Sequence, residues 1–320
     1  MRYDFGIDIG GTNIDVGLVK EHETVVSRRN IKTQQHIDPK SAIEVITASM
    51  IEQMDKFGLT SSDISSIGIG ITGIIDHDKG ILQWSPNLVW KDLHFSEEFE
   101  GRLGIKTVVE NDANAAAIGE FFLGAGRGAV SSILVTLGTG IGGGFVNKGI
   151  LYKGINGSEV EIGHMVINKG GRECHCGRKG CFERYASASG LKITIQEKMA
   201  EYEDSLMWTL EDGDATKVST HTAFDAAALG DQAAKEALEL YYDDLALGLT
   251  NVINIFQPDM VILSGGLTNV GEELMIPVRE RVAKEVYSKN TDKNASIRVA
   301  TLGNDTGILG AANIIRARED

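Results

Sequence analysis

The chain has 320 residues, a length typical of one large domain or two of ordinary size. Hydrophobic residues make up 42% and charged residues 24% of it, which is usual for a folded globular protein and excludes disorder over most of the length. The formal net charge of −14 argues against a nucleic-acid-binding surface, which needs a basic footprint, so we expect no nucleic acid partner.

The first half of the chain alternates predicted strands with glycine turns and helices. Asp38 and Pro39 are typical of a helix start, because Asp caps free N–H groups and Pro fits the first turn, and Gly58 ends this helix. Its predicted apolar face comprises Ala42, Val45, Ile46, Ser49, Met50 and Met54. Strands are predicted at Tyr3–Ile9, 14–18, 67–71, 107–109 and 133–137, and a second helix at 113–122.

The second half contains a long helical pattern over residues 231–255, which Pro258 stops because it lacks a backbone N–H. Residues 200–222 are polar and acidic and are expected to form an exposed irregular loop within a helical region. Further strands are predicted at 260–263 and 297–302, and a closing helix at 307–318. The strand and glycines around residue 138 resemble the opening of the chain, which indicates a weak internal duplication.

No secretory signal or membrane segment is expected. Residues 1–12 lack the basic start and apolar stretch of a signal peptide. Residues 128–147 carry no charge and could span a bilayer by length, but half of them are Gly, Ser or Thr, which predicts a buried strand and a loop. We therefore expect a cytoplasmic protein without membrane contact.

Two glycine loops lie between predicted strands, one at Gly10, Gly11 and Thr12 and one around Gly138 to Gly140. Such loops expose backbone N–H groups to an anion, although the same residues are also typical of simple hairpin turns. The presence of two loops, one of them beside Asp8, favours phosphate with Mg²⁺, because a phosphate-bound Mg²⁺ takes a carboxylate from the protein.

Asp112 lies where a predicted strand turns into an apolar helix, so it is expected to face a crevice at the end of a sheet. A carboxylate there suits the general base of a phosphoryl transfer. The alternative interpretation is a helix N-cap, a role that Asn and Asp often fill.

The three cysteines, Cys174, Cys176 and Cys181, lie close together and are joined by His164 as a fourth candidate ligand. Four nitrogen and sulfur ligands are typical of a closed structural zinc site. Three reduced thiols are the alternative, and His175 is a rival fourth ligand. An odd, tightly spaced set favours metal over a disulfide.

Together these segments resemble the ROK family of sugar kinases and related repressors, within the actin/hexokinase-like ATPase superfamily. The matching residues follow the family order over nearly the whole chain, and the cysteine segment is the most specific of them. They are Asp8, Gly10, Gly11, Thr12 and Asn13, then Glu110, Asn111, Asp112 and Asn114, then Gly138, Thr139, Gly140, Gly142, Gly143 and Gly144, then Glu161, Gly163 and His164, then Cys174, Cys176, Cys181 and Glu183, then Ser264, Gly265 and Gly266.

The resemblance implies an α/β, two-domain actin-like ATPase (ribonuclease H-like) fold with a cleft between the domains. We expect a small domain of residues 1–111 plus about 301–320, and a large domain of 112–300 that carries a zinc-binding loop at 164–183.

The resemblance also implies a role for each site residue, except that Asn13 is assigned none. Asp112 would be the general base, and the sugar would be held by Asn87, Asn111, Asp112, Glu161, His164 and Glu183. ATP with Mg²⁺ would be bound by Asp8, Gly10, Gly11, Thr12, Gly138, Thr139, Gly140, Gly265 and Gly266. Structural Zn²⁺ would be bound by His164, Cys174, Cys176 and Cys181.

The implied activity is ATP-dependent phosphorylation of a hexose, with glucose at its 6-hydroxyl as the first candidate. Kinases for N-acetylmannosamine, N-acetylglucosamine, fructose or allose are alternatives, as is a sugar-responsive regulator without kinase activity. The related repressors carry an additional helix-turn-helix segment, for which a strand beginning at Tyr3 leaves no room, and the acidic chain favours the kinase. We expect a homodimer or homotetramer.

Overall fold

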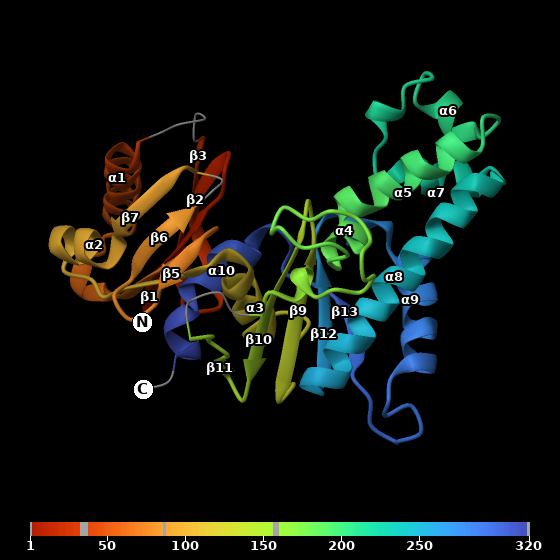
Figure 1. Cartoon of the computed structure of the whole chain (residues 1–320). Helices are drawn as coiled ribbons and strands as arrows, with labels where there is room; N and C mark the ends of the chain where they lie inside the picture. Colours follow the sequence, from red (N-terminus) through yellow and green to blue (C-terminus); the bar gives the residue numbers. More distant parts are fainter. Residues whose placement is uncertain (1, 33–37, 86–87, 156–159, 319–320) are drawn as a thin grey trace. The chain divides into compact units, whose positions relative to one another are not determined.

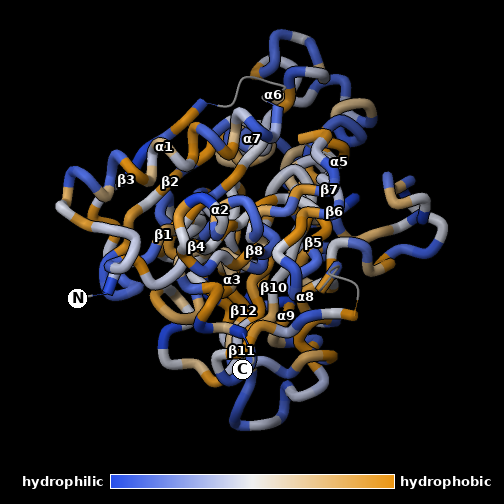
Figure 2. The backbone as a smooth tube through the Cα atoms, turned by 90° about the vertical axis from the view of Figure 1, so that its left-hand side faces the viewer, coloured by the Kyte–Doolittle hydropathy of each residue, from blue (hydrophilic) through white to orange (hydrophobic). Residues whose placement is uncertain are grey.

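The computed structural model describes residues 2–32, 38–85, 88–155 and 160–318 (Figure 1). The chain divides into two compact units. The first comprises Met1–Leu134, Gly143–Val160 and Ala300–Asp320, and the second comprises Val135–Gly142 and Glu161–Val299. Figure 2 shows long hydrophobic stretches along the strands and hydrophilic stretches in many outer loops.

A five-stranded sheet organises the first unit, in the order β3-β2-β1-β4-β8. β1 pairs antiparallel with β2 and parallel with β4, and β4 pairs parallel with β8. The strands are β1 (Tyr3–Ile9), β2 (Asn13–Lys20), β3 (Thr24–Lys32), β4 (Ile64–Ile71) and β8 (Thr107–Asn111). Because β1, β4 and β8 are parallel, their carboxyl ends meet at one edge of the sheet.

The helices beside this sheet bury apolar faces against it. They are α1 (Pro39–Phe57), α2 (Phe95–Leu103), α3 (Asp112–Phe122) and α10 (Thr306–Ala312). Side chains from β1, β2, β4, α1 and α2 form one core cluster, which includes Phe5, Ile69, Met50 and Phe99.

Backbone-to-backbone packing brings α10 onto β1 and β4. A Cβ on Gly6 would lie 2.0 Å from the carbonyl oxygen of Ile308, and one on Gly68 would lie 1.8 Å from that of Ala311. Glycine is therefore required at both positions, because any side chain would push the helix off the sheet.

The start and end of α1 confirm the prediction, but its buried face corrects it. Asp38 caps the backbone N–H groups of Lys40 and Ser41, and Gly58 ends the helix in the left-handed conformation. Val45 is 37% exposed, whereas Ile43 is buried. With 3.6 residues per turn, Ile43 falls on the same face as Met50, and Val45 falls nearly opposite.

A three-stranded antiparallel sheet, in the order β5-β6-β7, was not predicted. Its strands are short, with β5 at Ile74–Asp76, β6 at Ile81–Ser85 and β7 at Trp90–His94. Only Ile75, Leu82, Ser85 and Trp90 of these strands are buried, so the alternating signal is too brief to read in the sequence.

The second five-stranded sheet has the order β11-β10-β9-β12-β13. Its strands are β9 (Ser131–Leu137), β10 (Ile141–Asn147), β11 (Ile150–Leu151), β12 (Met260–Ser264) and β13 (Ser296–Val299). Read across either sheet, the strands are the third, second, first, fourth and fifth of that sheet in chain order. This shared order agrees with the internal duplication expected from the glycine loops.

The helices of the second unit pack mainly around α8 (Gln232–Phe256), which contacts α5, α7 and α9. The others are α4 (Glu183–Ala186), α5 (Ala188–Glu201), α6 (Leu206–Leu210), α7 (His221–Ala228) and α9 (Glu272–Glu285). The long helical pattern is confirmed, with Asp231 as its N-cap.

Three sequence predictions were wrong in detail. The segment 200–222 is not wholly an exposed loop, because it contains α6 and buries Met207 and Val218. The last strand ends at Val299, and shortly after it the backbone N–H groups of Thr301 and Leu302 donate to the carboxylate of Glu120 instead of to a neighbouring strand.

The third correction concerns the closing helix, which ends at Ala312 and is followed by a separate 3-10 turn at Ile314–Ala317. The break lies at Asn313, whose side-chain amide is fully buried and donates to the carbonyl groups of Leu309 and His22.

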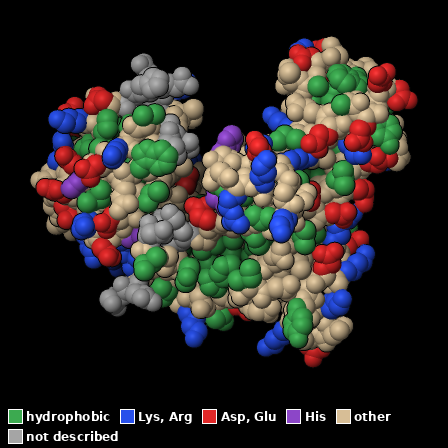
Figure 3. Space-filling model, in the orientation of Figure 1, with side chains coloured by type: hydrophobic (Ala, Val, Ile, Leu, Met, Phe, Trp, Pro, Cys, Tyr) green, Lys and Arg blue, Asp and Glu red, His purple; other side chains and the backbone are tan. Residues whose placement is uncertain are grey.

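Among the described helices, none is both long and apolar enough to cross a bilayer. On the face drawn in Figure 3, acidic and basic side chains are interspersed among polar and apolar ones, as expected for a chain with 45 acidic and 31 basic residues.

Candidate active site and metal centre

Acidic and amide side chains gather at the carboxyl edge of the first sheet. Asp8 on β1 is in register with Gly70 on β4, and Ile71 on β4 is in register with Asn111 on β8. Asp112 and Thr72 each follow the last residue of their strand. The parallel pairing therefore brings these side chains to one edge, where ligands bind in open α/β sheets.

Asp112 is held at two points. Its Oδ1 accepts from the backbone N–H of Ala113 at 3.0 Å, and its Oδ2 accepts from the hydroxyl of Thr72 at 2.7 Å. The N-cap of α3 is Asn111, whose Oδ1 also accepts from Ala113 at 2.9 Å. Asn111 therefore fills the capping role that sequence alone allowed for Asp112, and Asp112 is the first residue inside the helix.

Asp8 carries a perturbed carboxyl group. Burial raises its pKa to about 6, and the negative charges of Asp112 and Asp15 act in the same direction, while Arg28 partly offsets them. A divalent cation would relieve this repulsion, and carboxylate oxygens are the ligands that Mg²⁺ prefers. The carboxylates here thus fit the ion that the resemblance implies.

The first glycine loop is the hairpin between β1 and β2. Gly10 donates its N–H to the carbonyl of Asn13 at 2.9 Å, and the amide of Asn13 donates to the hydroxyl of Thr12 at 3.2 Å. Gly11 and Thr12 are exposed. The loop is a hairpin turn, and its tip is accessible to a ligand.

In the second unit, the loop after β9 lies beside the end of β12. The N–H of Gly138 bonds to the carbonyl of Gly140 at 3.1 Å, and Thr139 is exposed. A Cβ on Gly265 would lie 2.5 Å from the carbonyl oxygen of Leu137. Gly265, and with it Gly266, therefore lies at the same edge as Gly138, Thr139 and Gly140.

The four predicted zinc ligands come together. One ligand atom from each of His164, Cys174, Cys176 and Cys181 lies within 4.8 Å of the others. Sγ of Cys176 is 3.6 Å from that of Cys181, and Sγ of Cys174 is 3.6 Å from Nδ1 of His164. Tetrahedral zinc with ordinary bond lengths needs ligand separations of about 3.6–3.8 Å, so these residues fit the metal.

The same geometry argues against a disulfide and against His175 as the fourth ligand. All three are free thiols, and His175 is exposed and outside the cluster. Burial raises the pKa of the Cys174 thiol to about 12, whereas the backbone N–H of Arg178 lowers that of Cys176.

Two carboxylates flank His164. This residue is the last of a 3-10 turn at Ile162–His164. Nδ1 of His164 faces Cys174 and lies 3.7 Å from Oε1 of Glu183, while Nε2 lies 3.9 Å from Oε2 of Glu161. One ring nitrogen thus faces the cysteines and the other faces Glu161.

Glu183 also approaches the second glycine loop. A Cβ on Gly140 would lie only 2.7 Å from Oε2 of Glu183, so this position leaves no room for a side chain unless the carboxylate moves. The first residue of α4 thereby contacts both the cysteine and histidine cluster and the glycine loop.

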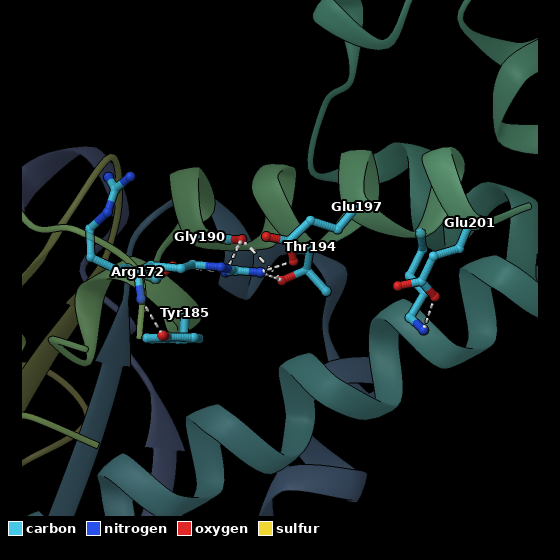
Figure 4. Close-up of polar contacts among 8 residues, drawn as sticks. Arg172, Tyr185, Gly190, Thr194, Glu197 and Glu201 are labelled. Carbon is cyan, nitrogen blue, oxygen red and sulfur yellow. Dashed lines mark hydrogen bonds and ion pairs between the residues drawn. The ribbon is translucent and has the colours of Figure 1, made fainter. Parts of the chain in front are cut away.

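Arg172 anchors the loop that carries the three cysteines to the helices behind it (Figure 4). Its guanidinium donates to the carbonyl groups of Arg184 and Gly190 at 2.9 and 3.2 Å and to the hydroxyl of Thr194 at 3.0 Å. Its backbone N–H donates to the hydroxyl of Tyr185 at 2.7 Å, and the guanidinium also covers the ring of Tyr185. Arg172 therefore ties this loop to α4 and α5.

The predicted site residues are divided between the two units. The first unit contains Asp8, Gly10, Gly11, Thr12, Asn111 and Asp112, and the second contains Gly138, Thr139, Gly140, Glu161, His164, Cys174, Cys176, Cys181, Glu183, Gly265 and Gly266. Asn87 lies outside the described residues. Sequence reasoning missed Thr72 and Arg172; Thr72 shares with Asp112 the signal of a polar residue directly after a buried strand.

Known proteins resemble this chain over almost its whole length. The chain is 37% identical to a glucokinase from Thermotoga maritima, covering 98% of this chain and 97% of that one. It is 30% identical to a xylose repressor from Bacillus subtilis, covering 98% of this chain and 77% of the repressor. A crystal structure of a ROK family glucokinase from Streptomyces griseus, in complex with glucose and AMPPNP, matches with a TM-score of 0.77 and 30% identity, covering 98% of both chains.

Two sheets of the same strand order, each with a glycine loop after its first strand, define an α/β protein with the actin-like ATPase fold of the ROK sugar kinase structures. The ROK family model matches residues 4–318, and the chain belongs to the ROK family.

Proposed function

We propose that this protein is an ATP-dependent hexose kinase and that glucose, phosphorylated at its 6-hydroxyl, is its main substrate. The observation that carries the proposal is the carboxylate of Asp112, fixed at the carboxyl edge of the sheet in a chain that resembles glucokinases from end to end. Phosphoryl transfer needs a positioned base and charge stabilisation more than covalent chemistry, and this edge supplies the base.

In the proposed mechanism, Asp112 accepts the proton of the attacking sugar hydroxyl as the oxygen bonds to the γ-phosphorus of ATP. The bond from that phosphorus to the bridging oxygen breaks, and ADP leaves. Asn111, next to the base, is proposed to bind the same sugar. Asn87 is proposed to bind it as well.

Glu161, His164 and Glu183 are proposed to hold the remaining sugar hydroxyls. Each carboxylate can accept hydrogen bonds from two hydroxyl groups, which suits a polyol. Glu183 is 17% exposed and Glu161 is 58% exposed, so Glu183 is the more desolvated of the two and is expected to contribute more to affinity.

Asp8, Gly10, Gly11, Thr12, Gly138, Thr139, Gly140, Gly265 and Gly266 are proposed to bind ATP. When bound, Mg²⁺ would neutralise phosphate charge, and the raised pKa of Asp8 is the observation that favours a cation there. His164, Cys174, Cys176 and Cys181 are proposed to bind structural zinc, which would stiffen the loop that carries Glu183.

Two further proposals concern organisation. One is a functional division into a small domain, 1–111 with about 301–320, and a large domain, 112–300; it differs from the two compact units, which place residues 112–134 and 143–160 with the first unit. The other is a homodimer or homotetramer.

A coupled assay of ADP release with glucose, N-acetylmannosamine, N-acetylglucosamine, fructose, allose and xylose tests the activity. We expect glucose to have the highest kcat/KM. A higher value for another hexose would correct the substrate. Xylose is included because the resemblance to a xylose repressor is the specific observation in favour of the alternative, a sugar-binding regulator. Sugar binding without turnover of any sugar would support that alternative and overturn the kinase.

A further inference from the structure

Thr72 and Asp112 meet across two parallel strands. Each is the first residue after its strand, and the last residues of the two strands, Ile71 and Asn111, are in register. The hydroxyl of Thr72 lies 2.7 Å from Oδ2 of Asp112, and both residues are partly buried. The contact is therefore a direct consequence of the strand pairing.

The direction of this hydrogen bond follows from chemistry. An ionised carboxylate only accepts, so the hydroxyl of Thr72 must donate its proton to Asp112. A hydroxyl has one proton, which leaves the oxygen of Thr72 able only to accept from any further group. Oδ1 of Asp112 already accepts from Ala113, so both carboxylate oxygens have a fixed donor.

We propose that Thr72 is a positioning residue for the base of the proposed kinase reaction. It holds the plane of the Asp112 carboxylate and, together with it, offers only acceptors to an incoming sugar hydroxyl. That hydroxyl must then point its proton toward the pair, which leaves an oxygen lone pair free for the γ-phosphorus. The inference rests on the proposed function, because it assigns Thr72 to the same reaction.

A second hydrogen bond holds the loop after β4, so the hydroxyl of Thr72 can be removed without loss of the local structure. The amide of Asn111 donates to the carbonyl of Gly73 at 3.4 Å, so the two loops remain joined when the hydroxyl is removed. Replacement of Thr72 by Val keeps the β-branched shape and removes the hydroxyl, both as donor to Asp112 and as acceptor. This is the substitution that tests the inference.

The experiment compares Thr72→Val and Thr72→Ser with the wild type. In Thr72→Val we expect kcat for the best hexose to fall about tenfold to a hundredfold, because a misplaced catalytic group costs rate, with little change in the KM for ATP. Thr72→Ser retains the donor and should keep kcat within about threefold of the wild type. Thr47→Val is the matched control, since the hydroxyl of Thr47 donates within α1 to the carbonyl of Ile43, away from Asp112.

Combination with Asp112→Asn distinguishes a positioning role from a general structural one. If Thr72 acts through Asp112, Thr72→Val should cause no further loss once the carboxylate is gone. Thr72→Ala replaces the Val variant if that variant does not fold, as judged by circular dichroism and thermal melting.

Full kcat in Thr72→Val, or an equal loss in the Asp112→Asn background, would overturn the inference and leave the kinase assignment intact. A wild-type chain that turns over no hexose would overturn the proposed function, and the role of Thr72 would fall with it.

Discussion

Oε1 of Glu183 lies 3.1 Å from Sγ of Cys174, within the distance at which the thiol donates to the carboxylate. Cys174 is one of the four proposed zinc ligands, and Glu183 is a proposed sugar ligand. A bound metal would take the sulfur as its own ligand and leave Oε1 to accept from a sugar hydroxyl. The proposed metal centre and the proposed sugar site therefore share one contact.

Zinc is expected to support sugar affinity as well as local structure. Freshly purified protein should contain about one zinc per chain. Cys176→Ser, or prolonged chelation, should raise the KM for the sugar more than the KM for ATP, because Glu183 contacts Cys174 and His164 belongs to the cluster. Atomic absorption and steady-state kinetics measure the two effects.

His175→Gln is the matched control for this prediction, since His175 lies in the same loop but outside the cluster. It should keep the zinc and the sugar affinity. Loss of zinc in that variant would make His175 the fourth ligand, and unchanged sugar affinity in folded, zinc-free protein would limit the metal to a structural role.

Asp112→Asn should lower kcat by about 10²- to 10⁴-fold and leave sugar binding largely unchanged. The amide keeps the size of the side chain but cannot accept the proton, and Asn111 still caps α3. Single-turnover kinetics and calorimetric titration with the sugar separate the two effects. Asp292→Asn, an exposed site, is the control, and near-normal kcat in Asp112→Asn would remove this residue from the mechanism.

Arg172→Gln should destabilise the protein by about 2–3 kcal/mol, because the guanidinium donates to two carbonyl groups and a hydroxyl and is 16% exposed. The sugar KM should rise with it, since Arg184 directly follows Glu183. Urea denaturation and kinetics check both parts.

Arg102→Gln provides the comparison for Arg172, since Arg102 pairs with Glu98 on the surface of α2. Such surface pairs contribute about 0–1 kcal/mol. Equal destabilisation by the two variants would show that the contacts of Arg172 do not anchor the loop.

Asp8→Asn should inactivate the enzyme and stabilise the metal-free fold. The pKa of Asp8 is raised from 3.8 to about 6, so the folded state binds the proton more tightly than the unfolded state. The contribution of Asp8 to the free energy of unfolding is therefore fully present below about pH 4 and is lost as the pH rises through about 6. The total loss is about 3 kcal/mol.

Replacement of Asp8 by the neutral amide removes that cost. The gain in unfolding free energy, measured in EDTA, should be larger at pH 8 than at pH 5 by about 1 kcal/mol. A gain that is the same at both pH values would mean that Asp8 is not the titrating group.

Much of the local structure was readable from sequence, because caps and periodic patterns act within a few residues. Asp38 and Gly58 bound α1 as predicted, and the buried run Tyr3–Ile9 is β1 as predicted. The motifs that resemble the ROK family also pointed to the four candidate metal ligands, which the structure brings together; three of them lie within eight residues of one another.

Other features were decided only by tertiary structure, because they depend on residues far apart in the chain. The partner of Asp112 is Thr72, forty residues earlier, and only the pairing of β4 with β8 brings the two together. The closing helix breaks at Asn313 because its buried amide bonds to the carbonyl of His22, a contact that spans 291 positions. A periodic pattern of apolar residues predicts the secondary structure of one segment. It does not predict which distant residue that segment will contact, and such contacts determine the positions of Asp112 and Asn313.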